Sequence, residues 1–167
     1  MTQKTKRIAA LGLLASLAVI LSYVEAILPP LFSAVPGIKM GLPNLVILFL
    51  LYRFSLAEAA TVSLIRLGVT FLLFGNFPSF LYSLAGAVLS LTLMFLLKKT
   101  DRFSTVGVSV AGGVAHNLGQ ILVAVFLLQT AEIAYYMIIL AVSGTVAGAL
   151  IGLAGAALLK HTAHLKL

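Results

Sequence analysis

Apolar residues run in long blocks along this chain of 167 residues, and short polar joints separate the blocks. A helix needs about 20 apolar residues to cross a bilayer core of about 30 Å. The pattern therefore predicts an all-α integral membrane protein, a compact bundle of six transmembrane helices that forms a single transmembrane domain over residues 1–167. Five blocks are long enough to span, near 8–28, 56–75, 79–97, 104–128 and 132–159, and a short or tilted helix is expected near 41–54.

Composition agrees with a membrane location and narrows the chemistry. Hydrophobic residues make up 62% of the chain and charged residues 9%, and the mean hydropathy is +1.18. A soluble domain has about 45–50% apolar residues. The absence of cysteine excludes disulfides, thiolate metal sites and a cysteine nucleophile. The sequence also has no G-x-x-x-x-G-K-[ST] motif, so this chain does not hydrolyse ATP through a P-loop, and we expect neither a cofactor nor a metal site.

The net charge of +7 predicts orientation rather than nucleic-acid binding, because the basic residues fall in the joints between apolar blocks. With the N-terminus in the cytoplasm, nine of the 11 lysines and arginines lie on the inner side, Lys39 lies outside and Arg66 lies within a helix. This assignment requires the 41–54 block to cross. We expect a multi-pass protein of the bacterial cytoplasmic membrane, with both termini cytoplasmic. The bilayer is then a partner and nucleic acid is not.

Small residues recur at helical spacing and predict close helix packing, because small side chains let helix backbones approach in lipid. One interpretation is packing within the bundle, and the other is docking of a partner protein. The repeats are Gly107, Ala111, Ala115 and Gly119 in the fifth block and Gly144, Gly148, Gly152 and Ala156 in the sixth; the candidate docking positions of the first are Gly12, Ala15, Ser16, Ala18 and Ser22.

Polar side chains gather in the outer half of the predicted bundle, where they are costly to bury. They predict an outward-facing pocket for a small molecule, in which polar groups orient the ligand within an apolar shell. Interhelical hydrogen bonding is the alternative role for the polar residues of 116–120. The candidate substrate-binding residues are Asn44, Arg66, His116, Asn117, Gln120, Glu25, Lys39, Asn76 and Tyr82.

Arg66 needs a counter-ion at its predicted depth. Glu25 is the plausible protein partner, a bound anion is the second possibility, and Glu58 lies two helical turns away. The loop at 29–40 is either a lid over the pocket or a plain connector. Arg66, Lys39 and His116 together favour an anionic or carbonyl-rich ligand.

Three segments resemble the small membrane family called Gx transporters, whose members are often labelled heptaprenyl diphosphate synthase component I. They are PGIKMGLPN (36–44), FLLFGNFPSFLYSLAGAVLS (71–90) and GVSVAGGVAHNLGQ (107–120). The family is similar to the S components of energy-coupling factor (ECF) transporters. The resemblance implies a six-helix S-component fold that binds a vitamin-like molecule from outside. It also implies that a T-type scaffold subunit and ATPases are separate chains.

The sequence thus favours a membrane-embedded substrate-binding subunit for ECF-type, ATP-driven uptake by partner subunits. Two alternatives are a non-catalytic membrane component of an isoprenoid or quinone-pathway enzyme and a subunit of a membrane redox complex. Catalysis by this chain is not expected, because a prenyl diphosphate synthase binds diphosphate through Mg²⁺ held by clustered aspartates. This chain has a single aspartate, Asp101. Flavin, a prenyl-type precursor and other vitamins all fit as ligands.

Overall fold

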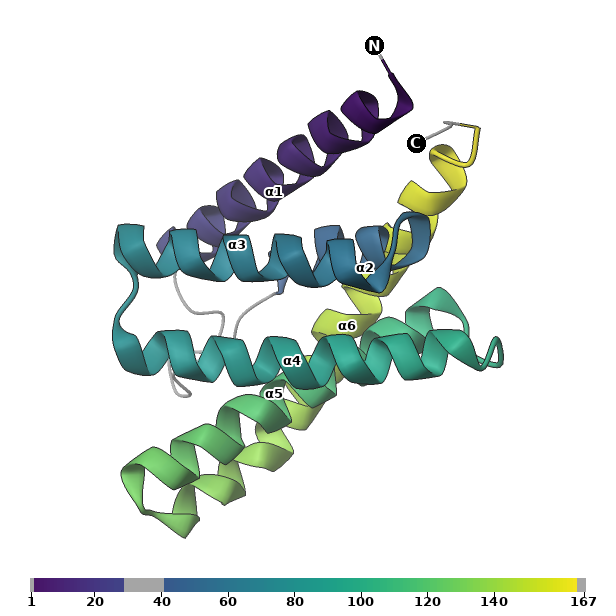
Figure 1. Cartoon of the computed structure of the whole chain (residues 1–167). Helices are drawn as coiled ribbons and strands as arrows, with labels where there is room; N and C mark the ends of the chain where they lie inside the picture. Colours follow the sequence, from purple (N-terminus) through teal and green to yellow (C-terminus); the bar gives the residue numbers. More distant parts are fainter. Residues whose placement is uncertain (1, 29–40, 165–167) are drawn as a thin grey trace.

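The computed structural model describes residues 2–28 and 41–164, and in these ranges the regular structure is helical. The chain forms α1 (Gln3–Ile27), α2 (Leu42–Arg53), α3 (Leu56–Phe74), α4 (Phe77–Lys99), α5 (Thr105–Leu128), a short 3₁₀ helix η1 (Ala131–Tyr135) and α6 (Tyr136–His161) (Figure 1). Most of these ends lie within a few residues of the blocks expected from the sequence, while α1 begins at Gln3 and α6 at Tyr136. Five of the α-helices, α2 being the exception, are long and apolar enough to cross a membrane.

Polar caps set the helix starts at three joints. Ser55 and Glu58 form a capping box at α3, in which each side chain accepts a backbone N–H of the other residue. Asn76 caps α4 by accepting from the N–H of Ser79 at 2.9 Å, and Ser104 caps α5. These side chains satisfy N–H groups that a helix start leaves without partners.

Helix α2 is a core helix. It has 12 residues, so it is about 18 Å long at 1.5 Å per residue. The segment from Val46 to Leu51 is at most 4% exposed, which means that the helix is covered on all sides. It packs with Ala18, Val62 and Val108 in the main apolar cluster. The five long helices are compatible with a multi-pass membrane protein, while a crossing by α2, and hence six spans, stays a prediction.

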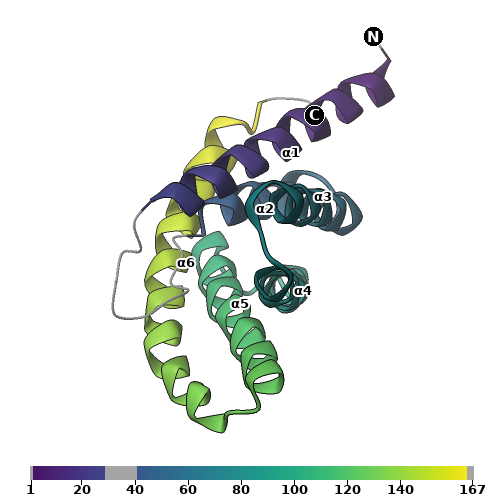
Figure 2. The same ribbon diagram turned by 90° about the vertical axis from the view of Figure 1, so that its left-hand side faces the viewer.

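The helices are arranged so that both ends of the chain lie toward one side of the molecule (Figure 1). The joints between α2 and α3 and between α4 and α5 lie toward the same side. Helices α5 and α6 run side by side in both views, and α1 lies across the top of the bundle (Figures 1 and 2). This placement agrees with the predicted grouping of the termini, and their cytoplasmic location stays a prediction.

The small residues of α5 and α6 pack within the bundle. A Cβ added at Gly148 would lie 2.7 Å from the Cα of Val110, and one added at Gly119 would lie 2.7 Å from the carbonyl oxygen of Ala85. At such distances only the hydrogen side chain of glycine fits, so these glycines allow the close spacing of α4, α5 and α6. Of the two interpretations of the small-residue repeats, internal packing therefore applies at these positions.

A polar contact joins α1 to α3 at the side of the molecule where the termini lie. Arg7 donates two hydrogen bonds to the carboxylate of Glu58, at 2.6 and 2.8 Å. Glu58 is thus engaged by Arg7 and by the Ser55 cap. It is not the counter-ion of Arg66.

Candidate ligand-binding pocket

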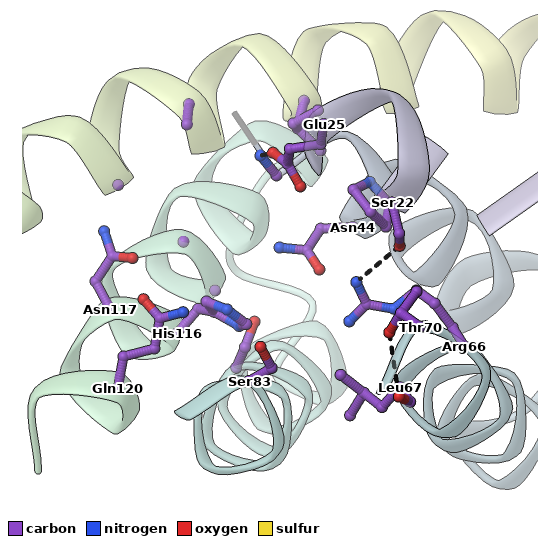
Figure 3. Close-up of a pocket in the computed structure, with 18 of the residues that line it drawn as sticks. Ser22, Glu25, Asn44, Arg66, Leu67, Thr70, Ser83, His116, Asn117 and Gln120 are labelled. Carbon is purple, nitrogen blue, oxygen red and sulfur yellow. Dashed lines mark hydrogen bonds between the residues drawn. The ribbon is translucent and has the colours of Figure 1, made fainter. Parts of the chain in front are cut away.

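A cavity of about 320 Å³ lies inside the bundle, and all six α-helices contribute to its lining. Ligand pockets in proteins start at about 300 Å³, so this one has room for a compact small molecule. Figure 3 shows polar side chains that face the cavity from opposite sides. Six of the predicted substrate-binding residues line it: Glu25, Asn44, Arg66, His116, Asn117 and Gln120.

The α5 wall carries His116, Asn117 and Gln120 (Figure 3). The side-chain amide of Asn117 donates to the carbonyl oxygen of Leu140 at 2.6 Å, which ties α5 to α6. A Cβ added at Gly144 would lie 2.8 Å from Asn117 Nδ2, so only glycine leaves room for this amide. Asn117 is therefore an interhelical hydrogen-bonding residue as well as a lining residue.

His116 is held where α5 passes α4. A Cβ added at Gly86 would lie 2.8 Å from His116 Cε1, so the imidazole rests against the bare backbone of Gly86. Gln120 lies one turn further along α5, and its amide offers both a donor and an acceptor to the cavity. The α5 wall thus presents hydrogen-bonding groups on a tightly packed support.

The opposite wall carries Arg66 from α3. Its side chain is 8% exposed, and Nη1 donates to the Ser22 hydroxyl at 3.4 Å. Its Nε has no acceptor among the residues that the structure describes. The carboxylate of Glu25 favours the guanidinium charge electrostatically. The protein therefore holds Arg66 by one long hydrogen bond and by a nearby negative charge.

Glu25 joins the end of α1 to the start of α2. Its carboxylate accepts a hydrogen bond from the backbone N–H of Gly41. Gly41 has a φ of +73°, a left-handed conformation in which glycine is favoured, and it precedes α2 directly. Asn44 follows on the first turn of α2, and Figure 3 shows it between the Arg66 wall and the α5 wall.

Other predicted residues lie elsewhere. The Asn76 side chain caps α4, and neither Asn76 nor Tyr82 is among the residues that line the cavity. Tyr82 immediately precedes the lining residue Ser83, and neighbouring helical residues point about 100° apart. Lys39 and the 29–40 loop lie outside the described residues.

The predicted docking positions of α1 separate into two sets. Ala18 is fully buried and Ser22 lines the cavity, so both face the inside of the bundle. Gly12 and Ser16 are exposed, and Ala15 is partly buried beside a shallow apolar groove between α1 and α3.

Several lining residues were missed at the level of sequence. Ser79, Ser83 and Ser90 follow one face of α4, and Thr70 and Ser109 join them from α3 and α5. The α4 serines stand at i, i+4 and i+11, a spacing that places side chains on one helix face. That periodicity was a usable signal, because three hydroxyls on one face of an apolar helix indicate a polar environment.

The lining combines hydrogen-bonding and charged groups with aromatic rings. Its groups are amides, hydroxyls, one imidazole, one guanidinium and one carboxylate, inside a shell that includes Phe71 and Phe80. Among the described residues, no group of three or more His, Asp or Glu side chains is placed to hold a metal ion. Asp101 lies in the joint between α4 and α5, and it does not line the cavity.

One family model matches the chain. It is described as heptaprenyl diphosphate synthase component I, and it covers residues 14–158. The matched range includes all six of the predicted residues that line the cavity. No curated protein and no solved structure matches the chain, so the ECF S-component fold stays a prediction.

Proposed function

From the premise that the chain belongs to the heptaprenyl diphosphate synthase component I family, we propose that it is a non-catalytic, membrane-embedded component of a multi-chain system, and that it binds a small molecule. The observation that carries this proposal is the cavity of about 320 Å³ lined by polar groups from all six α-helices. Polar groups inside an apolar bundle are costly unless they have hydrogen-bond or charge partners. A ligand with matching hydrogen-bonding groups provides such partners.

The family name supports a catalytic prenyl diphosphate synthase chain as the partner. Catalysis then belongs to the partner, because prenyl transfer releases diphosphate as the leaving group, which is bound by Mg²⁺ on carboxylates. This chain supplies a single carboxylate, Glu25, to its cavity among the described residues. Its role in such a complex is to hold or present a small molecule at the membrane.

A second candidate is the substrate-binding subunit of an ECF-type transporter, with a T-type scaffold and ATPases as partners. The cavity with its polar groups favours it, since capture of a solute needs a binding site but no reaction centre. The exposed positions Gly12 and Ser16 on α1 leave a small-residue surface for a membrane partner.

One experiment separates these possibilities. The tagged protein is purified from native membranes in mild detergent, and the sample is divided between proteomics and small-molecule mass spectrometry after denaturation. A stoichiometric small molecule supports ligand binding. A co-purified prenyl synthase then identifies the first partner, and a T-type scaffold with ATPases identifies the second.

The same purification can also give a result that contradicts ligand binding. Recovery of redox subunits without any releasable small molecule would favour a structural subunit of a redox complex and would refute ligand binding. Gln120→Ala is the internal control, because Gln120 lines the cavity and makes no hydrogen bond to a described residue. It should release the small molecule while the partner proteins still co-purify.

A further inference from the structure

Arg66 is the most costly side chain inside the bundle. It lies near the middle of α3, and among the described residues it is the one charged side chain that is buried. A charge at this depth in a membrane helix is expensive and usually marks a functional site. Its position raises the question of which group balances it.

The protein leaves part of the guanidinium unused. A guanidinium has several N–H donors in a planar fork. Nη1 makes one long hydrogen bond of 3.4 Å to Ser22, and Nε has no acceptor among the described residues. Glu58 is held by Arg7, and the Glu25 carboxylate accepts from the N–H of Gly41. The Arg66 fork therefore retains donors at the wall of the cavity.

The charge balance of the cavity limits the anion that fits. Among the described lining residues, Arg66 is the one lysine or arginine and Glu25 the one carboxylate. A diphosphate carries two or more negative charges and is usually bound through several cations or Mg²⁺. Glu25 repels any anion in a low-dielectric site, and this repulsion is at least twice as large for a diphosphate as for a monoanion at the same distance. A singly charged oxyanion matches the shape of the fork and carries the smallest negative charge that can pair with it.

We propose that Arg66 binds a singly charged oxyanion group of the ligand, a carboxylate or a singly charged phosphate ester, and that a diphosphate is excluded. The rest of the molecule extends across the cavity toward the amides of Asn117 and Gln120, with Asn44 between the two ends (Figure 3). Phe71 and Phe80, whose ring centroids are 5.1 Å apart, supply apolar surface on the Arg66 side. This inference rests on the ligand-binding function proposed above.

The test uses the full chain in lipid nanodiscs, freed of co-purified small molecules, and three probes. Benzoate represents a carboxylate, dimethyl phosphate a singly charged phosphate ester, and inorganic diphosphate the excluded class. Affinity is measured from the probe dependence of thermal unfolding. We expect benzoate or dimethyl phosphate to bind the unaltered protein, and whichever binds more tightly identifies the source of the oxyanion.

Variants assign the binding to Arg66. Arg66→Gln should weaken the monoanion at least tenfold, and Arg66→Lys should lie in between because it keeps the charge but loses the fork. The matched control is Arg7→Gln, which removes the same charge outside the cavity, from the exposed pair with Glu58, and should leave affinity unchanged. If Arg66→Gln does not fold, the Arg66→Lys affinity decides.

The inference is overturned if neither monoanion binds the unaltered protein, if the Arg66 variants bind as tightly as the control, or if diphosphate binds tenfold more tightly than either monoanion. Its failure is distinct from failure of the proposed function. A stoichiometric small molecule released from the native preparation leaves ligand binding intact, even when all three probes fail. Absence of any such molecule refutes the function itself.

Discussion

The two walls of the cavity are built differently. On the α5 side, backbones touch through glycines, and Asn117 is bonded to the α6 carbonyl of Leu140 at 2.6 Å. On the α1 and α3 side, the contact between the two helices at the cavity is one long hydrogen bond of 3.4 Å from Arg66 to Ser22. We call the first side the rigid wall and the second the loose wall, because close backbone packing and a short hydrogen bond hold the first and one long hydrogen bond joins the helices of the second.

The largest expected effect comes from separating the helices of the rigid wall. In Gly148→Leu, the new side chain would meet the Val110 backbone at a Cβ distance of 2.7 Å, so α5 and α6 must move apart. We expect a loss of at least about 1–3 kcal/mol, the usual range for overpacking. Thermal unfolding in detergent measures it. Gly12→Leu is the control, because Gly12 is exposed and a Cβ added there meets nothing within 4 Å; an equal loss there would show that close backbone packing is not the cause.

Removing the charge from the loose wall should stabilise the ligand-free protein. Arg66→Met takes away a buried guanidinium that the protein holds by one long hydrogen bond, at a cost in a membrane helix of about 2.5–3.5 kcal/mol. We expect a gain of about 1–3 kcal/mol in the free energy of unfolding, seen as a higher Tm, because this cost exceeds the lost hydrogen bond to Ser22 and the lost attraction to Glu25, which is itself only partly buried. A lower Tm would show instead that Arg66 belongs to a structural ion pair.

The next effect concerns the hydrogen bond that ties α5 to α6. Asn117→Ala removes the donor to Leu140, and side-chain hydrogen bonds between membrane helices contribute about 0.6 to 1.7 kcal/mol. The Tm should fall accordingly. Gln120→Ala should leave the Tm nearly unchanged and reduce ligand retention alone. If both variants lower the Tm equally, the rigid wall does not depend on Asn117.

The smallest effect is expected at the contact between α1 and α3. Arg7→Gln breaks the pair with Glu58, in which the Arg7 side chain is half exposed. Exposed pairs contribute little and are screened by salt. A slight fall in Tm at low ionic strength should vanish at high ionic strength. A fall in Tm that persists at high ionic strength would mean that this pair stabilises the contact between α1 and α3 more strongly than its exposure indicates.

The sequence by itself determined the number of helices and their approximate positions along the chain. Apolar blocks of sufficient length predict α1, α3, α4, α5 and α6 because the bilayer sets the length. Caps such as Ser55 and Asn76 act on their own first turn, so their effect is local. The small-residue repeats of α5 and α6 were visible in the same way, since helical periodicity is a property of neighbouring residues.

Tertiary structure alone decided which faces meet. The sequence grouped Tyr82 and Asn76 with the substrate-binding residues, and their positions on α4 turn out to lie outside the cavity lining. It left the partner of Arg66 open, and the structure assigns Glu58 to Arg7 instead. Helix α2 is buried on every side, which its short apolar run does not reveal. The physical reason is that periodicity defines a face, whereas the rotation of each helix about its axis depends on the packing of all the others.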